Sequence, residues 1–282
     1  MSHTENQKKI RTKKEILANL DKISERKSFN FELKGLTRTT RDLLSDLIDK
    51  ILAHNNIDNP EAGFHIFSSM MEILLNALKG NIRFVIYKDE LLKKLDGGKP
   101  GDKEAEQLVK TILTTASLRD AMDRYVIPEK LKTSVQTILR LEEKIRVKKL
   151  QLDDDEAELL NSIRDLLDKG DYRICMKIVV TKSDIYIRIH NNVPIMLDDQ
   201  DRIMSSRRVH HRLFLEGRSG DFFRPEYLDE KESAGLGIAM VDEGYYNLGL
   251  NPIDLFSVTT SSKSTTIYMK YPVKALQEAK PL

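Results

Sequence analysis

The sequence predicts an α+β fold in which a mixed β-sheet has helices on one face, giving a two-layer α/β sandwich. Three observations indicate this class. Aromatic residues make up only 6% of the 282-residue chain and tryptophan is absent, while leucine and isoleucine dominate, which favours helices over strands. Helical periodicity fills most of the first 170 residues, and the period changes to two afterwards. Short segments with turn chemistry separate the elements.

The first part of the chain predicts one strand followed by two long helices. Residues 28–33 (SFNFEL) alternate like a short strand, and residues 37–53 have apolar side chains at the 3.6-residue period of an amphipathic helix. Pro60 suits the first turn of the next helix. That helix is strongly apolar from Phe64 to Leu78 and can continue to Leu95.

A charged block follows these helices. Residues 97–103 (GGKPGDK) have the chemistry of a turn or linker. They are not a nucleotide-binding P-loop, because Pro follows the lysine where that motif needs Ser or Thr. Residues 104–170 predict two or three helices that are charged on one side. The acidic run 153–156 suits a helix N-terminus, where carboxylates interact favourably with the helix dipole.

The last part of the chain predicts a hairpin, a polar loop, a helix and two further strands. Residues 174–180 and 185–190 flank the turn residues 181–184, which is a hairpin signal. The remaining elements are, in chain order, a polar arginine-rich loop over about 198–232, a helix from near Gly237, and strands over 254–259 and 265–271 around a serine-rich turn.

These elements divide the chain into three parts. A domain made of residues 28–96 and 172–276 is interrupted by a helical insertion over residues 97–171. Residues 1–27 form a basic arm, and residues 1–28 hold eight Lys or Arg against four Asp or Glu. We interpret the arm as solvated or as a frayed helix, with a docking tail as the alternative.

Composition excludes several classes of protein. The net charge of +2 gives no global argument for nucleic-acid binding. The single cysteine, Cys175, excludes a disulfide framework and a cysteine-rich metal site. No apolar run reaches the roughly 18 residues of a membrane span, and no apolar stretch follows the basic start as it would in a secretory signal. We therefore expect a cytoplasmic protein with no nucleic-acid or membrane partner.

One helix has an unusual polar side. Its polar residues share one narrow stripe and are mostly short and uncharged, namely His65, Ser68, Ser69, Glu72, Asn76 and Lys79. The simple interpretation is that this side of the helix faces solvent. However, the other solvent-exposed faces expected in this chain consist of Lys, Arg and Glu, unlike this stripe. Glu72 and Asn76 lie one turn apart, so they could jointly hold a metal-bound phosphate and act as a base.

Two further segments could contact a ligand. Residues 233–238 (SAGLGI) precede an apolar helix, and glycines at a helix entrance let backbone N–H groups approach a phosphate. The same pattern also makes a simple tight turn. Residues 191–195 (NNVPI) end a predicted strand, and by themselves they predict only a turn.

In this order the three segments resemble the motifs of the GHKL superfamily, which includes gyrase B, heat-shock protein 90, MutL, histidine kinases and anti-sigma-factor serine kinases. Residues 72–79 (EILLNALK) are similar to the N box, E-x-x-x-N-A-x-K. Residues 233–238 resemble the second glycine box, G-x-G-L-G-L, with Ser233 in place of its first glycine. Residues 191–195 stand where the family has D-N-G-P-G-I, and residues 265–272 (TTIYMKYP) resemble its closing strand.

The resemblance implies a Bergerat fold with ATP in a cleft between the helices and a glycine-rich lid. By position, Asn76 would coordinate Mg²⁺ on the phosphates, Glu72 would orient or deprotonate the attacking group, and Lys79 would lie near phosphate. Other expected contacts come from the second half of the chain: Asn191 at the adenine, Gly235, Leu236 and Gly237 at the lid exit, Thr266 or Thr265 at the adenine pocket, and Arg207, Arg208, Arg212, Arg218 and Arg224 around the triphosphate.

Two departures from the family affect recognition of the base. Asn191 stands in place of the Asp that accepts a hydrogen bond from the adenine amino group, and Val193 stands in place of the following glycine. An Asn carbonyl can accept the same bond without a charge. Since a charge-assisted bond contributes roughly 1.5–3 kcal/mol and a neutral one about 1 kcal/mol, we expect affinity to fall about tenfold without being lost.

Within the superfamily, the anti-sigma-factor serine kinases are the most similar branch. Neither His54 nor His65 has the context of a histidine-kinase phosphoacceptor, whereas the strand and helix before the N box resemble the serine kinases. The resemblance implies Mg-ATP-dependent phosphoryl transfer to, or regulation of, a protein partner, with the insertion as a partner surface or homodimer contact. Two alternatives remain: a catalytically silent interaction module, and the detached ATPase half of a split histidine kinase.

Overall fold

The computed structural model describes residues 10, 13–20, 27–33, 35–94, 103–104, 107, 111–112, 129–148, 151–195, 197–224 and 236–278. Five strands in these ranges form one open sheet of order β1-β2-β3-β5-β4. The strands are β1 (Ser28–Leu33), β2 (Ile174–Val180), β3 (Asp184–Asn191), β4 (Phe256–Thr260) and β5 (Thr265–Pro272). The predicted α+β class is confirmed. The expectation of a mixed sheet is wrong, because all four strand pairings are antiparallel.

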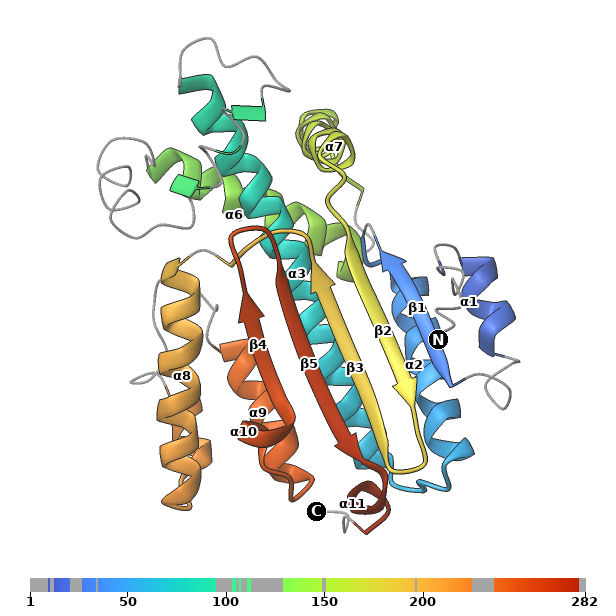
Figure 1. Cartoon of the computed structure of the whole chain (residues 1–282). Helices are drawn as coiled ribbons and strands as arrows, with labels where there is room; N and C mark the ends of the chain where they lie inside the picture. Colours follow the sequence, from blue (N-terminus) through green and yellow to red (C-terminus); the bar gives the residue numbers. More distant parts are fainter. Residues whose placement is uncertain are drawn as a thin grey trace.

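Helices lie against one face of this sheet (Figure 1). The helices are α1 (Lys13–Leu20), α2 (Arg38–His54), α3 (Pro60–Lys94), α6 (Glu129–Lys148), α7 (Asp154–Lys169), α8 (Leu197–Leu215), the short 3-10 helix η1 (Ser219–Phe223), α9 (Leu236–Asn247), α10 (Pro252–Leu255) and α11 (Val273–Glu278). The long helix α3 runs behind the middle of the sheet, with α2 and α9 on its two sides (Figure 1). No helix in the described ranges is long and apolar enough to span a membrane.

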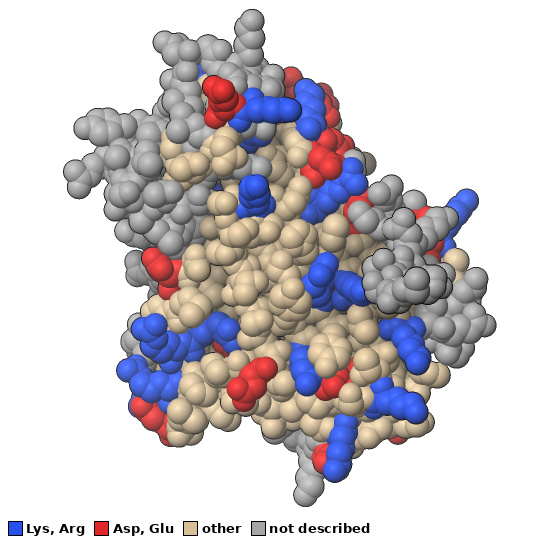
Figure 2. Space-filling view, in the orientation of Figure 1, with Lys and Arg blue, Asp and Glu red and all other residues tan. Residues whose placement is uncertain are grey.

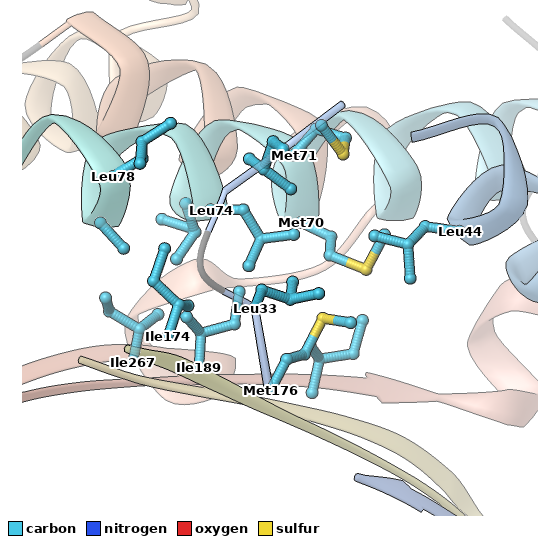
Figure 3. Close-up of a cluster of buried hydrophobic side chains, with 14 of the residues drawn as sticks. Leu33, Leu44, Met70, Met71, Leu74, Leu78, Ile174, Met176, Ile189 and Ile267 are labelled. Atoms are coloured by element: carbon cyan, nitrogen blue, oxygen red, sulfur yellow. The ribbon is translucent and has the colours of Figure 1, made fainter. Parts of the chain in front are cut away.

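The hydrophobic core lies between α3 and the sheet (Figure 3). The sheet contributes alternate residues, since successive side chains of a strand point to opposite faces. Ile174 and Met176 of β2 are buried while Cys175 between them is only half-buried. Met70 and Leu74 of α3, one turn apart, complete the contact and are fully buried. The strand period of two and the helix period of 3.6 residues, which predicted these elements, therefore both reflect burial at this interface.

Local sequence signals set several helix ends. The Thr37 side chain accepts a hydrogen bond from Thr40 N at 3.1 Å and caps α2, which begins at the next residue. Asp153 and Glu156 form a capping box at the start of α7, which confirms the acidic run as a helix N-terminus. The 97–103 turn lies outside the described residues.

The segment expected to be an arginine-rich loop is mostly helical. Residues 197–215 form α8 and residues 219–223 form η1, so the prediction of a loop over 198–232 is wrong up to the last described residue, Arg224. The segment contains no Gly or Pro between α8's start and Gly217, whose positive φ of 70° ends the helix. Ile203 and Leu213 of α8 are buried, whereas its Met204, Phe214 and Leu215 are exposed, so the apolar residues do not form one continuous stripe.

Part of the basic arm packs on the domain. Ile10 is buried and pairs with the outer edge of β1, donating to Asn30 O at 2.7 Å and accepting from Glu32 N at 2.9 Å. Ile16 of α1 is also buried, and α1 packs against α2. The described part of this segment is therefore not a solvated arm.

The opposite face of the sheet is turned toward the viewer in Figures 1 and 2. Figure 2 shows that its centre consists largely of uncharged residues, with scattered Lys and Arg side chains. Exposed side chains on this face include those of Tyr186, Arg188 and Tyr268, which alternate with buried neighbours along β3 and β5. In the part of the chain that the structure describes, the helical layer therefore covers one face of the sheet.

Candidate functional site

A cavity of about 440 Å³ lies between α3, α6, the start of α8 and the sheet. This volume falls in the range of about 300–1,000 Å³ that is typical of ligand pockets. Of its 25 lining residues 15 are apolar and ten are polar or charged, so apolar walls carry polar groups as they do in small-molecule sites. The polar lining relevant to the predicted motifs comprises Asn76, Lys79, Asn191 and Thr265.

Asn191 is the most informative residue of the cavity. It is the last residue of β3, it is only 4% exposed, and its Nδ2 donates to Ala77 O at 3.2 Å. Because a carbonyl can only accept, the NH₂ end must face Ala77, which leaves Oδ1 on the other side of the planar amide. Oδ1 is buried and has no hydrogen-bond partner among the described residues. A buried acceptor without a partner costs about 1–3 kcal/mol, which a ligand donor could offset. Because Oδ1 is enclosed, such a donor would reach it only after a small shift of the Asn191 amide or its neighbours.

The neighbouring residues make this strand end rigid. Thr265 Oγ1 donates to Val193 O at 3.0 Å, and Ile195 N donates to Thr260 Oγ1 at 3.0 Å. Val193, the departure from the family's glycine, is buried in the hydrophobic core and does not line the cavity. Its side chain therefore does not obstruct the pocket.

Of the two threonines expected near the base, only Thr265 lines the cavity. Thr266 points to the opposite face of the sheet, where its Oγ1 lies 2.8 Å from His190 Nδ1. Thr266 therefore lies on the face of the sheet that is turned away from this cavity, contrary to the prediction. Burial lowers the pKa of the His190 imidazole, and the nearby Arg188 guanidinium lowers it further.

The polar stripe of α3 is divided between the cavity and a helix contact. Asn76 and Lys79 line the cavity, and Lys79 forms no ion pair among the described residues. Glu72 does not line it. Its Oε1 accepts a hydrogen bond from Asn76 Nδ2 at 3.0 Å, which leaves Asn76 Oδ1 as the side-chain oxygen available to a cation.

Helix α9 covers the rest of the stripe. Gly237 lies in the first turn of α9 so close to α3 that an added Cβ would stand 1.8 Å from Glu72 Oε1. One further contact of this kind is Gly244, where a Cβ would meet His65 Nδ1 and Ser69 Oγ at 3.4 Å. These glycines thus permit close packing of two helices. Gly237 does not line the cavity, and Gly235 lies outside the described residues.

Leu236, the other member of the glycine box, begins α9. It packs against the small cluster of Leu213, Phe222 and Ala239, which joins α8, η1 and α9. Leu236 does not line the cavity either. The expected lid contacts of residues 235–237 are therefore not found at the cavity among the described residues.

The arginines expected around the triphosphate do not line the cavity. Arg207 binds the buried Asp242 through Nε and Nη2 at 2.9 Å, and Nη2 also donates to Phe256 O at 3.2 Å. Burial raises the pKa of the Asp242 carboxyl, and the Arg207 hydrogen bonds oppose that rise. Arg207 therefore fastens α8 to α9 and β4. The others lie on exposed surface: Arg208 and Arg212 on α8, and Arg218 and Arg224 in ion pairs with Asp221.

The cavity has two polar features that the motifs did not predict. Arg83 Nη1 binds Asp199 Oδ2 at 2.6 Å, which joins α3 to the start of α8 at the cavity wall. Arg83 continues the stripe of Glu72, Asn76 and Lys79 at helical spacing, so the sequence held a signal for it. The second feature is the row of α6 side chains, which no local pattern indicated.

A metal ion at this cavity would not be held by a cluster of His, Cys, Asp or Glu side chains from the described residues. No group of three His, Cys, Asp or Glu side chains suited to a metal exists in the part of the chain that the structure describes. Asn76 Oδ1 is a side-chain oxygen on the cavity wall, whereas Glu72 does not line the cavity. One protein oxygen is compatible with Mg²⁺, which usually keeps several waters and takes its remaining oxygens from substrate phosphates.

No protein-family model, curated protein or solved structure matches this chain.

Proposed function

We propose that this chain is an ATP-binding regulator of the GHKL type, with a Bergerat-like fold and with ATP in the 440 Å³ cavity. The main support is Asn191 Oδ1, a buried acceptor on the cavity wall without a partner among the described residues. The adenine amino group is a donor that would satisfy it. Convergence of Asn76, Lys79 and Asn191 on one cavity also supports the proposal, since these residues come from two motifs more than 110 residues apart.

The proposed roles follow from donor and acceptor chemistry. Lys79, which lines the cavity and forms no ion pair among the described residues, would bind a phosphate of ATP. Asn76 Oδ1 would contribute one ligand to Mg²⁺, whose charge would neutralise the phosphates when it is bound. The apolar wall, which includes Ile73, Ile238 and Ile267, would hold the base.

The proposed reaction is phosphoryl transfer from ATP to a Ser or Thr of a protein partner. The partner's hydroxyl oxygen would bond to the γ-phosphorus, the bond from that phosphorus to the β,γ-bridging oxygen would break, and ADP would leave. Glu72 would accept the hydroxyl proton. In the present structure its carboxylate is bonded to Asn76 and packed against Gly237, so the carboxylate would have to leave these contacts to act as a base.

Calorimetric titration of Mg-ATP into the purified protein tests nucleotide binding. We expect a dissociation constant in the micromolar-to-millimolar range, with adenosine bound and guanosine bound more weakly. Asn191→Leu, which is similar in size and cannot accept a hydrogen bond, should weaken ATP binding about fivefold to tenfold. Absence of heat and of a thermal shift with several millimolar Mg-ATP would contradict the proposal.

A second candidate is a catalytically silent interaction module that binds nucleotide or partners without transfer. The position of Glu72 favours it, because the expected base does not line the cavity. Single-turnover loss of γ-labelled ATP, with a candidate partner present, distinguishes the two. If Glu72 is the base, Glu72→Gln should lower transfer roughly 10²–10⁴-fold and leave Mg-ATP affinity within a few-fold. Equal transfer rates in wild type and variant would exclude Glu72 from the reaction.

A further inference from the structure

Helix α6 of the insertion forms a wall of the cavity. Its lining side chains form two adjacent rows along one helical face: Val135, Leu139 and Glu142 in the first, and Gln136, Arg140 and Glu143 in the second. Ile138 and Leu141 are buried on other sides of α6, which packs against both α3 and α7. The contact is therefore continuous over two turns rather than a single side chain at the rim.

The polar row of this wall includes a cation suited to an anionic ligand. Arg140 lines the cavity, is exposed, and forms no ion pair among the described residues. Lys79 of α3 also lines the cavity; it is half-buried and forms no ion pair among the described residues. These two cations stand against one lining carboxylate without an ion pair among the same residues, Glu143, so the balance is positive and favours an anionic ligand such as a polyphosphate.

The insertion is also connected to the end of the cavity at Asn191, where the adenine base would bind. Glu142 of α6 accepts hydrogen bonds from Arg164 of α7 at 3.1 and 3.2 Å. Beyond α7, Asp171 O accepts from Asn192 Nδ2 at 2.9 Å, and Asn192 directly follows Asn191. A ligand that contacts both α6 and Asn191 would therefore touch both ends of this connection.

We infer that α6 is part of the nucleotide site and that Arg140 binds a phosphate of ATP together with Lys79, so that bound ATP holds the insertion against the domain. This inference rests on the proposed ATP site and extends it to a segment that none of the predicted motifs includes.

Titration of Mg-ATP and adenosine into three proteins tests the role of Arg140. Arg140→Ala should weaken Mg-ATP binding about tenfold, because one charge-assisted contact is lost, and should leave adenosine binding within about twofold. Arg41→Ala is the matched control, since Arg41 is an exposed arginine of α2 that does not line the cavity. An equal loss for ATP and adenosine, or no loss for either, would overturn the assignment of Arg140 to phosphate.

Hydrogen exchange of the full chain tests whether ATP holds the insertion. Saturating Mg-ATP should slow amide exchange in α6 several-fold relative to the free protein, while β1, which contributes no residue to the cavity lining, serves as the internal reference. Unchanged exchange in α6 while calorimetry shows that ATP is bound would overturn the inference and leave the proposed function standing. Absence of ATP binding in the wild-type protein would overturn both.

Discussion

The contact between Gly237 and Glu72 permits a stability prediction that does not depend on the function. Gly237 is buried in α9, and a Cβ there would lie 1.8 Å from Glu72 Oε1, 2.6 Å from Cδ and 3.0 Å from Cγ. The Glu72 side chain is half-buried and bonded to Asn76. Gly237→Ala therefore cannot be accommodated by the carboxylate alone, because three successive atoms of the side chain must move.

The expected cost follows from two destabilising effects and one stabilising effect. Overpacking in a well-packed contact costs about 1–3 kcal/mol. Loss of the bond from Asn76 to Glu72 costs about 1 kcal/mol more, offset in part by the better helix propensity of Ala, up to about 1 kcal/mol. We therefore expect Gly237→Ala to lower the free energy of unfolding by about 1–3 kcal/mol. In a Glu72→Ala background, which lacks all three clashing atoms, the same change should be neutral or slightly stabilising.

Urea unfolding of the two single variants, the double variant and the wild type measures this coupling. Gly244→Ala is the matched control on the same helix, because its Cβ would stay 3.4 Å from the nearest atoms and should alter stability by less than about 1 kcal/mol. If Gly237→Ala costs the same in both backgrounds, α9 does not approach α3 at Glu72 and the packing argument fails.

Three further predictions concern the base contact, a buried ion pair and pH. Asn191→Asp replaces the Nδ2 donor that faces Ala77 O with a carboxylate oxygen, so it should lower the free energy of unfolding by about 1–3 kcal/mol. In calorimetry the variant should prefer ATP over GTP by about 1 kcal/mol more than the wild type does, through a charge-assisted bond to the adenine amino group; an unchanged ratio of ATP to GTP affinity would show that Asn191 does not face the base. Arg207→Ala should lower the free energy of unfolding by about 3–5 kcal/mol, because it leaves the buried Asp242 carboxylate unpaired, whereas the exposed Arg208→Ala should change urea unfolding by less than about 0.5 kcal/mol. Burial lowers the pKa of the His210 imidazole from its ordinary value of 6.5, with Glu243 opposing, so the unfolded chain takes up the proton first. Stability should therefore fall as pH drops below about 6.5, and equal unfolding free energies at about pH 7.5 and about pH 5.5 would contradict this.

Local interactions explain why much of the fold was predictable from sequence. The bounds of β1 and β2 match the alternating segments, because alternation along a strand reflects burial of one face. Thr37 and the Asp153–Glu156 capping box act within one turn of the helices that they begin. Helix α8 was missed for the converse reason: it buries few apolar residues, so its periodicity is weak.

The lining of the candidate cavity was predictable only for residues that the motifs place on a helix face or at a strand end. Asn76 and Lys79 share a face of α3, and Asn191 ends the strand beside it, so the motifs placed these three at one cavity. Whether Thr265 or Thr266 faces that cavity depends on strand register, since a shift of one residue exchanges the two faces. The sequence left that choice open.

What the sequence by itself determined is the set of elements, their order and the candidate residues on each one, because these follow from periodicity and capping within a few residues. The tertiary structure decided which candidates meet. Arg207 binds Asp242 and does not line the cavity, and Gly237 allows close packing of α9 on α3. The tertiary structure brought Arg140 to the cavity wall from an insertion more than 50 residues beyond the N box. Such contacts depend on how α6, α8 and α9 pack on α3, and no short segment of the chain encodes that packing.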